Sequence, residues 1–290
     1  MVIYMEKTVE KIINGRYTYD GAGVKLIRVF SNITDLTDPF LLLDNFGSNK
    51  IDDYINGFPW HPHRGIETVT YVLKGRVEHQ DSEGNKGVIY PGDTQWMTAG
   101  SGIFHEEMPK YIEENKNIYP DMAGFQLWVN LPRNKKMTTP VYRSLNGKDI
   151  PIINIENSKI KLIAGRFGKD YGYYDGGTQD VTYMHVILND DEILFKTKES
   201  YRTILYVFDG YIMINNNKYQ KGDAIILSES GDSITVYGKG EFLFMSGKPL
   251  KEPVAWYGPI VMNTIDEINQ AIIDLRRNTF VKEKNPIFES

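Results

Sequence analysis

Short runs of β-branched and aromatic residues recur along most of the chain, separated by Gly, Pro, Asn and Asp. Such runs predict strands, and their close spacing is typical of a β-barrel or a β-sandwich. The clearest runs are residues 24–30, 67–73, 125–131, 161–167, 182–188, 203–208 and 241–247.

One amphipathic helix is predicted near residues 264–277. Thr264 and Glu267 have the spacing of a capping box. The apolar residues that follow at helical spacing are Ile265, Ile268, Ala271, Ile272 and Leu275. The pattern therefore predicts an all-β protein whose chain closes with a helix.

The two halves of the chain have the character of a degenerate repeat. Residues 71–75 (YVLKG) and 90–93 (YPGD) match residues 206–210 (YVFDG) and 220–223 (QKGD). Each half predicts a strand, a glycine turn, a second strand and a Gly-Asp turn. A polar, turn-rich segment lies between the halves, so we expect two β-barrel domains, residues 1–135 and residues 136–290, with the helix in the second.

Composition narrows the available chemistry. The 290 residues include no cysteine, which excludes disulfides, thiolate nucleophiles and cysteine-ligated metals. The formal net charge of −5 gives no field that would attract nucleic acid. No apolar run reaches the roughly 18 residues of a membrane helix, and the N-terminal residues lack a signal-peptide core. We expect a cytoplasmic protein with no direct nucleic-acid or membrane binding.

The histidines give the strongest functional signal. His61 and His63 stand in a His-Pro-His sequence, and His105 begins a His-Glu-Glu sequence 42 residues after His63. Residues i and i+2 of a strand share a face, so His61 would lie beside His63, and His105 beside Glu107. This set of nitrogen and oxygen ligands predicts a site for one divalent transition metal: Fe, Mn, Ni, Co, Cu or Zn.

Spacing alone leaves the fourth ligand open. Glu67 follows His63 by four residues and would share its face of a strand, whereas Glu107 would share the face of His105. Glu106 should point away from the site.

Three further residues are candidates for contacts that support the ligands: Glu67, His79 and Trp96. A surface histidine of a hairpin is the favoured interpretation of His79, and Trp96 could be an ordinary core residue. In the second half, Lys196 and Lys198 occupy the repeat positions of His61 and His63. Only the first half is therefore expected to bind a metal.

These motifs resemble those of the pirins, a family of the cupin superfamily. The matching stretches are DPFLLLDNF from Asp38, GFPWHPHRGIETVTYVLKG from Gly57, PGDTQWMTAGSGIFHEEMP from Pro91, GFQLWVNLP from Gly124 and GPIVMNTIDEINQAIIDLR from Gly258. The resemblance implies a bicupin of two jelly-roll barrels, the first with one iron(II) and the second without metal. It also implies four ligands, His61, His63, His105 and Glu107, and so favours Glu107 over Glu67.

The resemblance further implies a quercetin 2,3-dioxygenase, which opens a flavonol or related enol ring with O2 and releases carbon monoxide. Glu107 would be the catalytic base as well as a ligand. A competing interpretation is an iron- or redox-sensing regulator that binds a protein partner, with little or no enzymatic activity. A third is a cupin that acts on another small enol or aromatic. The chain departs from the family pattern at Trp60, which would narrow the mouth of the site, and at Glu106.

Overall fold

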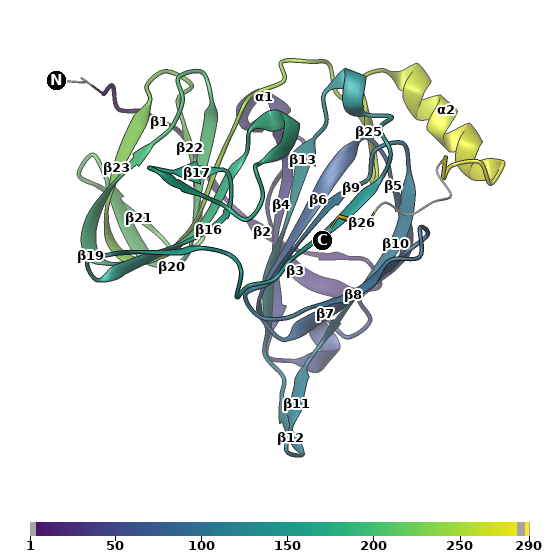
Figure 1. Ribbon diagram of the computed structural model, residues 1–290, viewed down its shortest axis with the longest axis horizontal. Helices are drawn as coiled ribbons and strands as arrows, with labels where there is room; N and C mark the ends of the chain where they lie inside the picture. Colours follow the sequence, from purple (N-terminus) through teal and green to yellow (C-terminus); the bar gives the residue numbers. More distant parts are fainter. Residues whose placement is uncertain (1–3, 283–287, 290) are drawn as a thin grey trace. The chain divides into compact units, whose positions relative to one another are not determined.

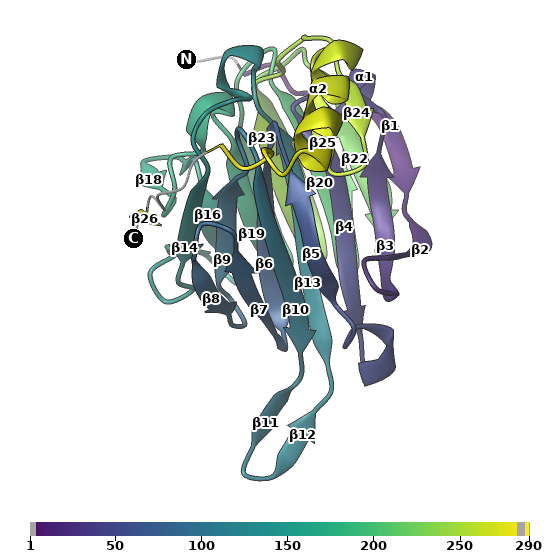
Figure 2. The same ribbon diagram turned by 90° about the vertical axis from the view of Figure 1, so that its right-hand side faces the viewer.

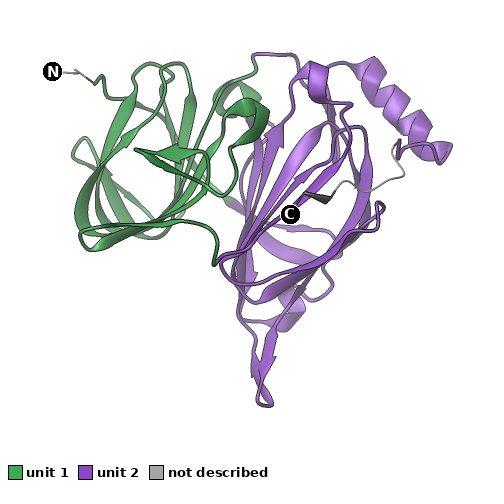
Figure 3. Cartoon of the chain, in the orientation of Figure 1, with its two compact units in different colours: residues 1–15, 33–39, 148–250 green, residues 16–32, 40–147, 251–290 purple. Residues whose placement is uncertain are grey.

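The computed structural model describes residues 4–282 and 288–289. The chain forms two compact units (Figure 3): unit 1 comprises residues 1–15, 33–39 and 148–250, and unit 2 comprises residues 16–32, 40–147 and 251–290. Strands dominate both units, and every strand run predicted from the sequence overlaps a strand. The predicted all-β architecture is confirmed.

Unit 2 contains the histidine motifs and is built from two main sheets (Figures 1 and 2). The larger sheet has the order β2 (Arg16–Asp20), β3 (Val24–Ser31), β4 (Phe40–Ser48), β13 (Met122–Asn130), β6 (Ile66–Lys74), β9 (Thr94–Thr98), β14 (Val141–Leu145) and β26 (Phe288–Glu289). The smaller sheet has the order β5 (Phe58–His63), β10 (Ile103–Lys110), β7 (Arg76–Asp81) and β8 (Lys86–Ile89). Hydrogen bonds between side chains of the two sheets show that their inner faces meet.

Two hairpins complete unit 2. One consists of β11 (Ile112–Glu114) and β12 (Asn117–Tyr119) and extends away from the sheets in Figure 2. The other consists of β24 (Ala255–Tyr257) and β25 (Ile260–Met262) and leads into helix α2 (Ile265–Arg276).

Unit 1 is one curved sheet around a hydrophobic core. Its order is β1 (Val9–Asn14), β22 (Asp223–Leu227), β20 (Arg202–Ile214), β23 (Ser233–Gly247), β19 (Thr182–Lys196), β16 (Ser158–Ala164) and β15 (Ile152–Ile155), with β21 (Asn217–Gln220) beside β20. The short pair β17 (Arg166–Phe167) and β18 (Asp170–Tyr171) and the helix α1 (Thr34–Thr37) belong to the same unit. Apolar side chains such as Phe195, Phe242 and Phe244 fill its interior.

The predicted division was into residues 1–135 and residues 136–290. In the structure, the N-terminal residues belong to the compact unit of the second half, and the C-terminal residues belong to the compact unit of the first half. Strand β1 pairs antiparallel with β22, from Val9 opposite Leu227 to Asn14 opposite Asp223, so the N-terminal strand completes unit 1. Residues 251–290 return to unit 2. Both exchanges depend on pairings between residues far apart in sequence, which local patterns do not report.

The two halves carry the repeat predicted from the sequence. The Gly92 N–H donates to the Val72 carbonyl at 2.8 Å, and the Gly222 N–H donates to the Val207 carbonyl at 2.8 Å. Each Gly-Asp turn also has an aspartate that accepts a backbone N–H three residues earlier in the chain. Both glycines have positive φ, of 92° and 101°, which disfavours other residues there.

Helix α2 confirms the predicted capping box. The Thr264 hydroxyl accepts from the Glu267 N–H at 3.2 Å, and the Glu267 carboxylate accepts from the Thr264 N–H at 2.9 Å. Ile268 and Ala271 are buried, but Ile265, which was predicted on the same stripe, is 66% exposed because it begins the helix outside the packed face. Among the described residues, no helix has the length and apolar content needed to cross a membrane.

A buried arginine fixes the C-terminal segment of unit 2. Arg64 donates to the Asp274 carboxylate at 2.8 Å, to the Ser101 carbonyl at 2.6 Å and to the Phe280 carbonyl at 2.8 Å. Its side chain is 2% exposed, so these partners replace the water that the guanidinium loses.

We expect Arg64→Ala to lower the free energy of unfolding by about 3–5 kcal/mol, because it leaves the Asp274 carboxylate without its buried partner. Lys282→Ala is the matched control, since Lys282 is the more exposed partner of the same carboxylate, at 2.9 Å. It should cost less than about 1 kcal/mol. Urea unfolding of the wild type and the two variants measures the difference. An equal loss of unfolding free energy in the two variants would show that Arg64 stabilises the fold no more than Lys282 does.

Candidate metal centre

The histidines are brought together by two neighbouring strands. In the antiparallel pair of β5 and β10, His61 stands directly opposite His105, and His63 stands opposite Ile103. Along β10, odd-numbered residues are buried and even-numbered residues are half-buried, so His105 and Glu107 share the inner face as predicted. The register shifts between His105 and Glu107, which marks a bulge next to the site.

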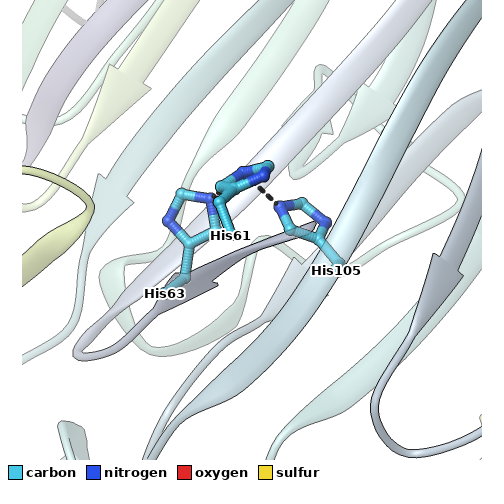
Figure 4. Close-up of side chains that lie close together, drawn as sticks. All are labelled: His61, His63 and His105. Atoms are coloured by element: carbon cyan, nitrogen blue, oxygen red, sulfur yellow. Dashed lines mark hydrogen bonds between the residues drawn. The ribbon is translucent and has the colours of Figure 1, made fainter. Parts of the chain in front are cut away.

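Three ring nitrogens converge in front of these strands (Figure 4). The His61 Nε2 atom lies 3.0 Å from His63 Nε2 and 2.9 Å from His105 Nε2. Nitrogens bound to one metal at about 2.1 Å and about 90° from each other would be about 3.0 Å apart. These three histidines could therefore hold a metal ion.

Main-chain carbonyls fix the tautomers of two of the rings. His61 Nδ1 lies 2.8 Å from the Pro59 carbonyl, and His63 Nδ1 lies 3.3 Å from the Pro259 carbonyl. A carbonyl only accepts, so each Nδ1 carries the proton and each Nε2 presents a lone pair. Two facing lone pairs repel each other, whereas a cation between them would be bound by both. This donor set fits a divalent transition metal.

Burial keeps the rings of His63 and His105 neutral. It lowers the pKa of His63 well below its usual range, and the neighbouring His61 lowers it further. Burial does the same to the pKa of His105, with added repulsion from the three other histidines of unit 2. Because only a neutral imidazole can bind a metal, the two buried rings remain competent as ligands at mildly acidic pH.

The Glu107 carboxylate lies beside His105 and is held by two side chains of the larger sheet. It accepts from the Thr70 hydroxyl at 2.8 Å and from the Gln126 amide at 2.7 Å. It forms a second group of candidate ligands with His79 and His105, whose ligand atoms lie within 4.8 Å of one another. The structure thus places Glu107 next to the histidine cluster, and its role as fourth ligand stays a prediction.

The other predicted residues have distinct positions. The Glu67 carboxylate accepts from the Trp96 indole at 3.0 Å and from the Thr98 hydroxyl at 2.6 Å, and Glu67 is in neither group of candidate ligands found among the described residues. His79 is buried, contrary to the surface alternative, and its ring centre lies 5.4 Å from that of His105. Glu106 points away, as predicted, and accepts a hydrogen bond from the Gln80 amide.

A cavity of about 670 Å³ opens beside His61 and His63. Its apolar lining is mainly aromatic: Phe58, Trp60, Trp128 and Trp256. Trp128 packs edge-on against the ring of His63, with centres 5.1 Å apart, and stacks on Trp256. Trp60 is 48% exposed, in keeping with the predicted position at the mouth.

The structure adds residues that sequence reasoning missed. Asp44 and Arg28 line the cavity, Gln126 and Thr70 hold Glu107, and Pro259 provides the acceptor for His63. A polar residue inside an apolar strand run is a sequence signal that could have identified two of them. Asp44 stands in LLLDNF, and Gln126 stands in FQLWVN. No sequence signal marks the Pro259 carbonyl.

Comparisons with known proteins agree with this geometry. The family model described as Pirin matches residues 23–129, and the model described as Pirin C-terminal cupin domain matches residues 183–281. A protein of Thermoplasma acidophilum, provisionally named a quercetin 2,3-dioxygenase, is 43% identical over 84% of this chain and 100% of its own length. A protein of Pseudomonas aeruginosa with the same provisional name is 39% identical over 93% of this chain and 96% of its own.

A solved structure extends the comparison to the fold. The crystal structure of quercetin 2,3-dioxygenase from Acinetobacter baumannii matches with a TM-score of 0.86 and 32% identity, and the match covers 95% of this chain and 99% of that chain. Two barrels of related sequence, one with a cluster of histidines inside, define a bicupin. The chain belongs to the pirin family, which confirms the predicted bicupin fold with its C-terminal helix.

The lowered pKa values of His63 and His105 predict how the metal-free protein responds to pH. Below about pH 6.5 the unfolded chain takes up protons on these histidines while the folded protein resists them. Stability should therefore fall as the pH drops, by up to about 1.4 kcal/mol per pH unit for each histidine.

Urea unfolding in the presence of a chelator, at pH values between 5 and 7.5, measures this slope. The double variant His63→Gln and His105→Gln should show a flatter dependence. Both proteins keep every other titrating group, so their difference isolates the two histidines. An equal slope in the two proteins would contradict the assignment.

Proposed function

We propose that this protein is a metal-dependent dioxygenase of the pirin type, which opens the ring of quercetin or a related flavonol or enol with O2 and releases carbon monoxide. The observation that carries the proposal is the meeting of three imidazole nitrogens at an aromatic-lined cavity of about 670 Å³. Such walls suit a planar aromatic substrate. The provisional names of two relatives and the name of the matching crystal structure support the same reaction.

We further propose iron(II) as the cofactor, with His61, His63, His105 and Glu107 as ligands. A bound divalent metal supplies Lewis-acid and redox chemistry toward O2. The chain's own contribution is to hold three neutral imidazoles in place, two of them through carbonyl hydrogen bonds. The reaction combines one flavonol with one O2 to give one ring-opened ester and one carbon monoxide, so it needs no further reductant.

Glu107 is the proposed catalytic base. Thr70 and Gln126 each donate one hydrogen bond to it, and each carboxylate oxygen retains a further lone pair that can accept a proton from the substrate hydroxyl. Thr70 and Gln126 act as positioning residues, because they set the direction of the carboxylate beside His105.

The first test pairs metal analysis with turnover. Protein purified without oxygen should contain about one metal per chain, consume quercetin when O2 is added, and release carbon monoxide. His61→Ala should lose both metal and activity. His185→Ala is the matched control, because His185 lies in unit 1, where its Nε2 faces the Glu241 carboxylate at 2.9 Å, and it should keep both.

The outcomes separate the candidate functions. Bound metal without quercetin loss or carbon monoxide would reject the dioxygenase and favour the regulator that binds a protein partner. The absence of any metal would reject the site itself. The cytoplasmic location stays a prediction under every outcome.

A second test concerns the base. We expect Glu107→Gln to retain part of the metal but to lower turnover at least a hundredfold, as is typical when a general base is removed. Metal content per chain and the initial rate at saturating quercetin provide the two readouts. Unchanged turnover would rule out Glu107 as the base.

A further inference from the structure

We propose that Arg28 and Asp44 form the part of the cavity that recognises a substrate hydroxyl away from the histidines, and that the site therefore selects neutral polyhydroxylated aromatics over aromatics with a carboxylate at that end. The inference rests on the proposed function, from which it takes the reaction. The predicted binding preference does not depend on that reaction. It assigns a specificity-determining role to residues outside the candidate metal ligands.

A row of polar residues crosses the inner face of the larger sheet. Arg28 of β3 pairs with Asp44 of β4, Asp44 with Gln126 of β13, Gln126 with Thr70 of β6, and Thr70 with Gln95 of β9. These are direct neighbours on five consecutive strands. At a strand spacing of about 4.8 Å, Asp44 lies about 10 Å from Thr70. The row therefore runs from the surroundings of Glu107 toward the cavity.

One end of this row is covered by the facing sheet, and the other end faces the cavity. Thr70 and Gln126 donate to Glu107, and the Gln95 amide lies 3.1 Å from His79 Nδ1. Arg28 and Asp44 line the cavity, whose lining also includes Gln126. Within the described part of the chain, the hydrogen bonds of the Asp44 side chain come from Arg28 alone. At the Thr70 and Gln95 end of the row, side chains of β10 and β7 cover the polar residues. At the Arg28 and Asp44 end, a ligand in the cavity would cover them.

The Asp44 carboxylate is set up to accept a further hydrogen bond. It is 5% exposed, and two of its four lone-pair positions are used by Arg28, at 3.0 and 2.8 Å. Burial raises its pKa to about 6 although the Arg28 bonds oppose this shift. A buried carboxylate that lacks donors is costly, so a hydroxyl that donates to Asp44 is favoured.

The charges at this end of the cavity disfavour an anionic ligand. The Arg28 guanidinium pairs with both Asp44, at 2.8 Å, and Asp20, at 2.6 Å. Two carboxylates against one guanidinium leave a net negative charge, and Arg28 already donates to these two acids through its Nε and Nη2 atoms. A substrate carboxylate would meet repulsion there, whereas a phenolic hydroxyl would find an acceptor. The tryptophan walls bind the planar body of either compound equally.

The test measures ligand binding to metal-containing protein without oxygen, so that no turnover occurs. The probes are quercetin, 3-hydroxyflavone, which has only the 3-hydroxyl, and a 3-hydroxyflavone with a 4′-carboxylate. Quenching of tryptophan fluorescence reports binding, because three tryptophans line the cavity. Wild-type protein should bind quercetin about tenfold more tightly than 3-hydroxyflavone, which corresponds to one charge-assisted hydrogen bond, and should bind the carboxylate most weakly.

The variants separate hydrogen bonding from charge. Asp44→Leu should remove the preference for quercetin while changing 3-hydroxyflavone affinity less than about twofold. Asp44→Asn, which keeps the size and can serve if Asp44→Leu does not fold, should reduce the preference and bind the carboxylate probe more tightly than wild type does. Asp121→Asn is the control, since its carboxylate forms an exposed pair with Lys74, and it should leave the affinity for each probe unchanged.

The results for the inference and for the proposed function are distinguishable. Equal losses for all probes, an unchanged preference, or no binding of any probe to wild type would overturn the role of Arg28 and Asp44. Preference that depends on Asp44 in a protein that releases no carbon monoxide would support the inference and reject the dioxygenase. Turnover of quercetin with an unchanged binding preference in the Asp44 variants would support the dioxygenase and reject the role of Asp44.

Discussion

The buried guanidinium of Arg64 is the constraint around which the histidine-containing part of unit 2 is arranged. Its charge tolerates burial only because a carboxylate and two carbonyls surround it. One partner is in the loop after β9, and the other two lie in and after helix α2. Since Arg64 directly follows His63, satisfying the guanidinium also fixes the end of β5, from which the His63 ring extends.

A second buried cation ties the same C-terminal segment to the barrel. Lys136 Nζ donates to the carbonyls of Gly65 and Val261, at 2.9 Å each, and to the Asn130 side chain at 2.6 Å. Burial lowers the pKa of Lys136 to about 8, while the three acceptors use all of its ammonium donors. Together with the hydrogen bond from the Val261 N–H to the Arg64 carbonyl, at 3.0 Å, Lys136 holds Val261 next to the residues that follow β5. The C-terminal segment thus belongs to the candidate metal centre, because it brings the Pro259 carbonyl to His63.

The sequence was most informative about features that depend on residues close together along the chain. Period-two alternation predicted that His105 and Glu107 share a face, and the spacing of Thr264 and Glu267 predicted the start of α2. The pairing of β1 with β22 and the return of residues 251–290 to unit 2 could not be predicted in this way, because both depend on contacts between distant residues. The same limit applies to Asp44, whose position beside Gln126 appears only once the register of β4 and β13 is known.

The two carbonyls that hold the histidine rings both belong to prolines, Pro59 and Pro259. A main-chain oxygen is present whatever side chain a position carries, so a replacement at either position leaves the acceptor itself in place. The orientation of the candidate ligand nitrogens therefore depends on the path of the main chain rather than on the identity of a neighbouring side chain. During evolutionary drift, this arrangement would be insensitive to most point substitutions but vulnerable to insertions or deletions that displace the β24–β25 turn.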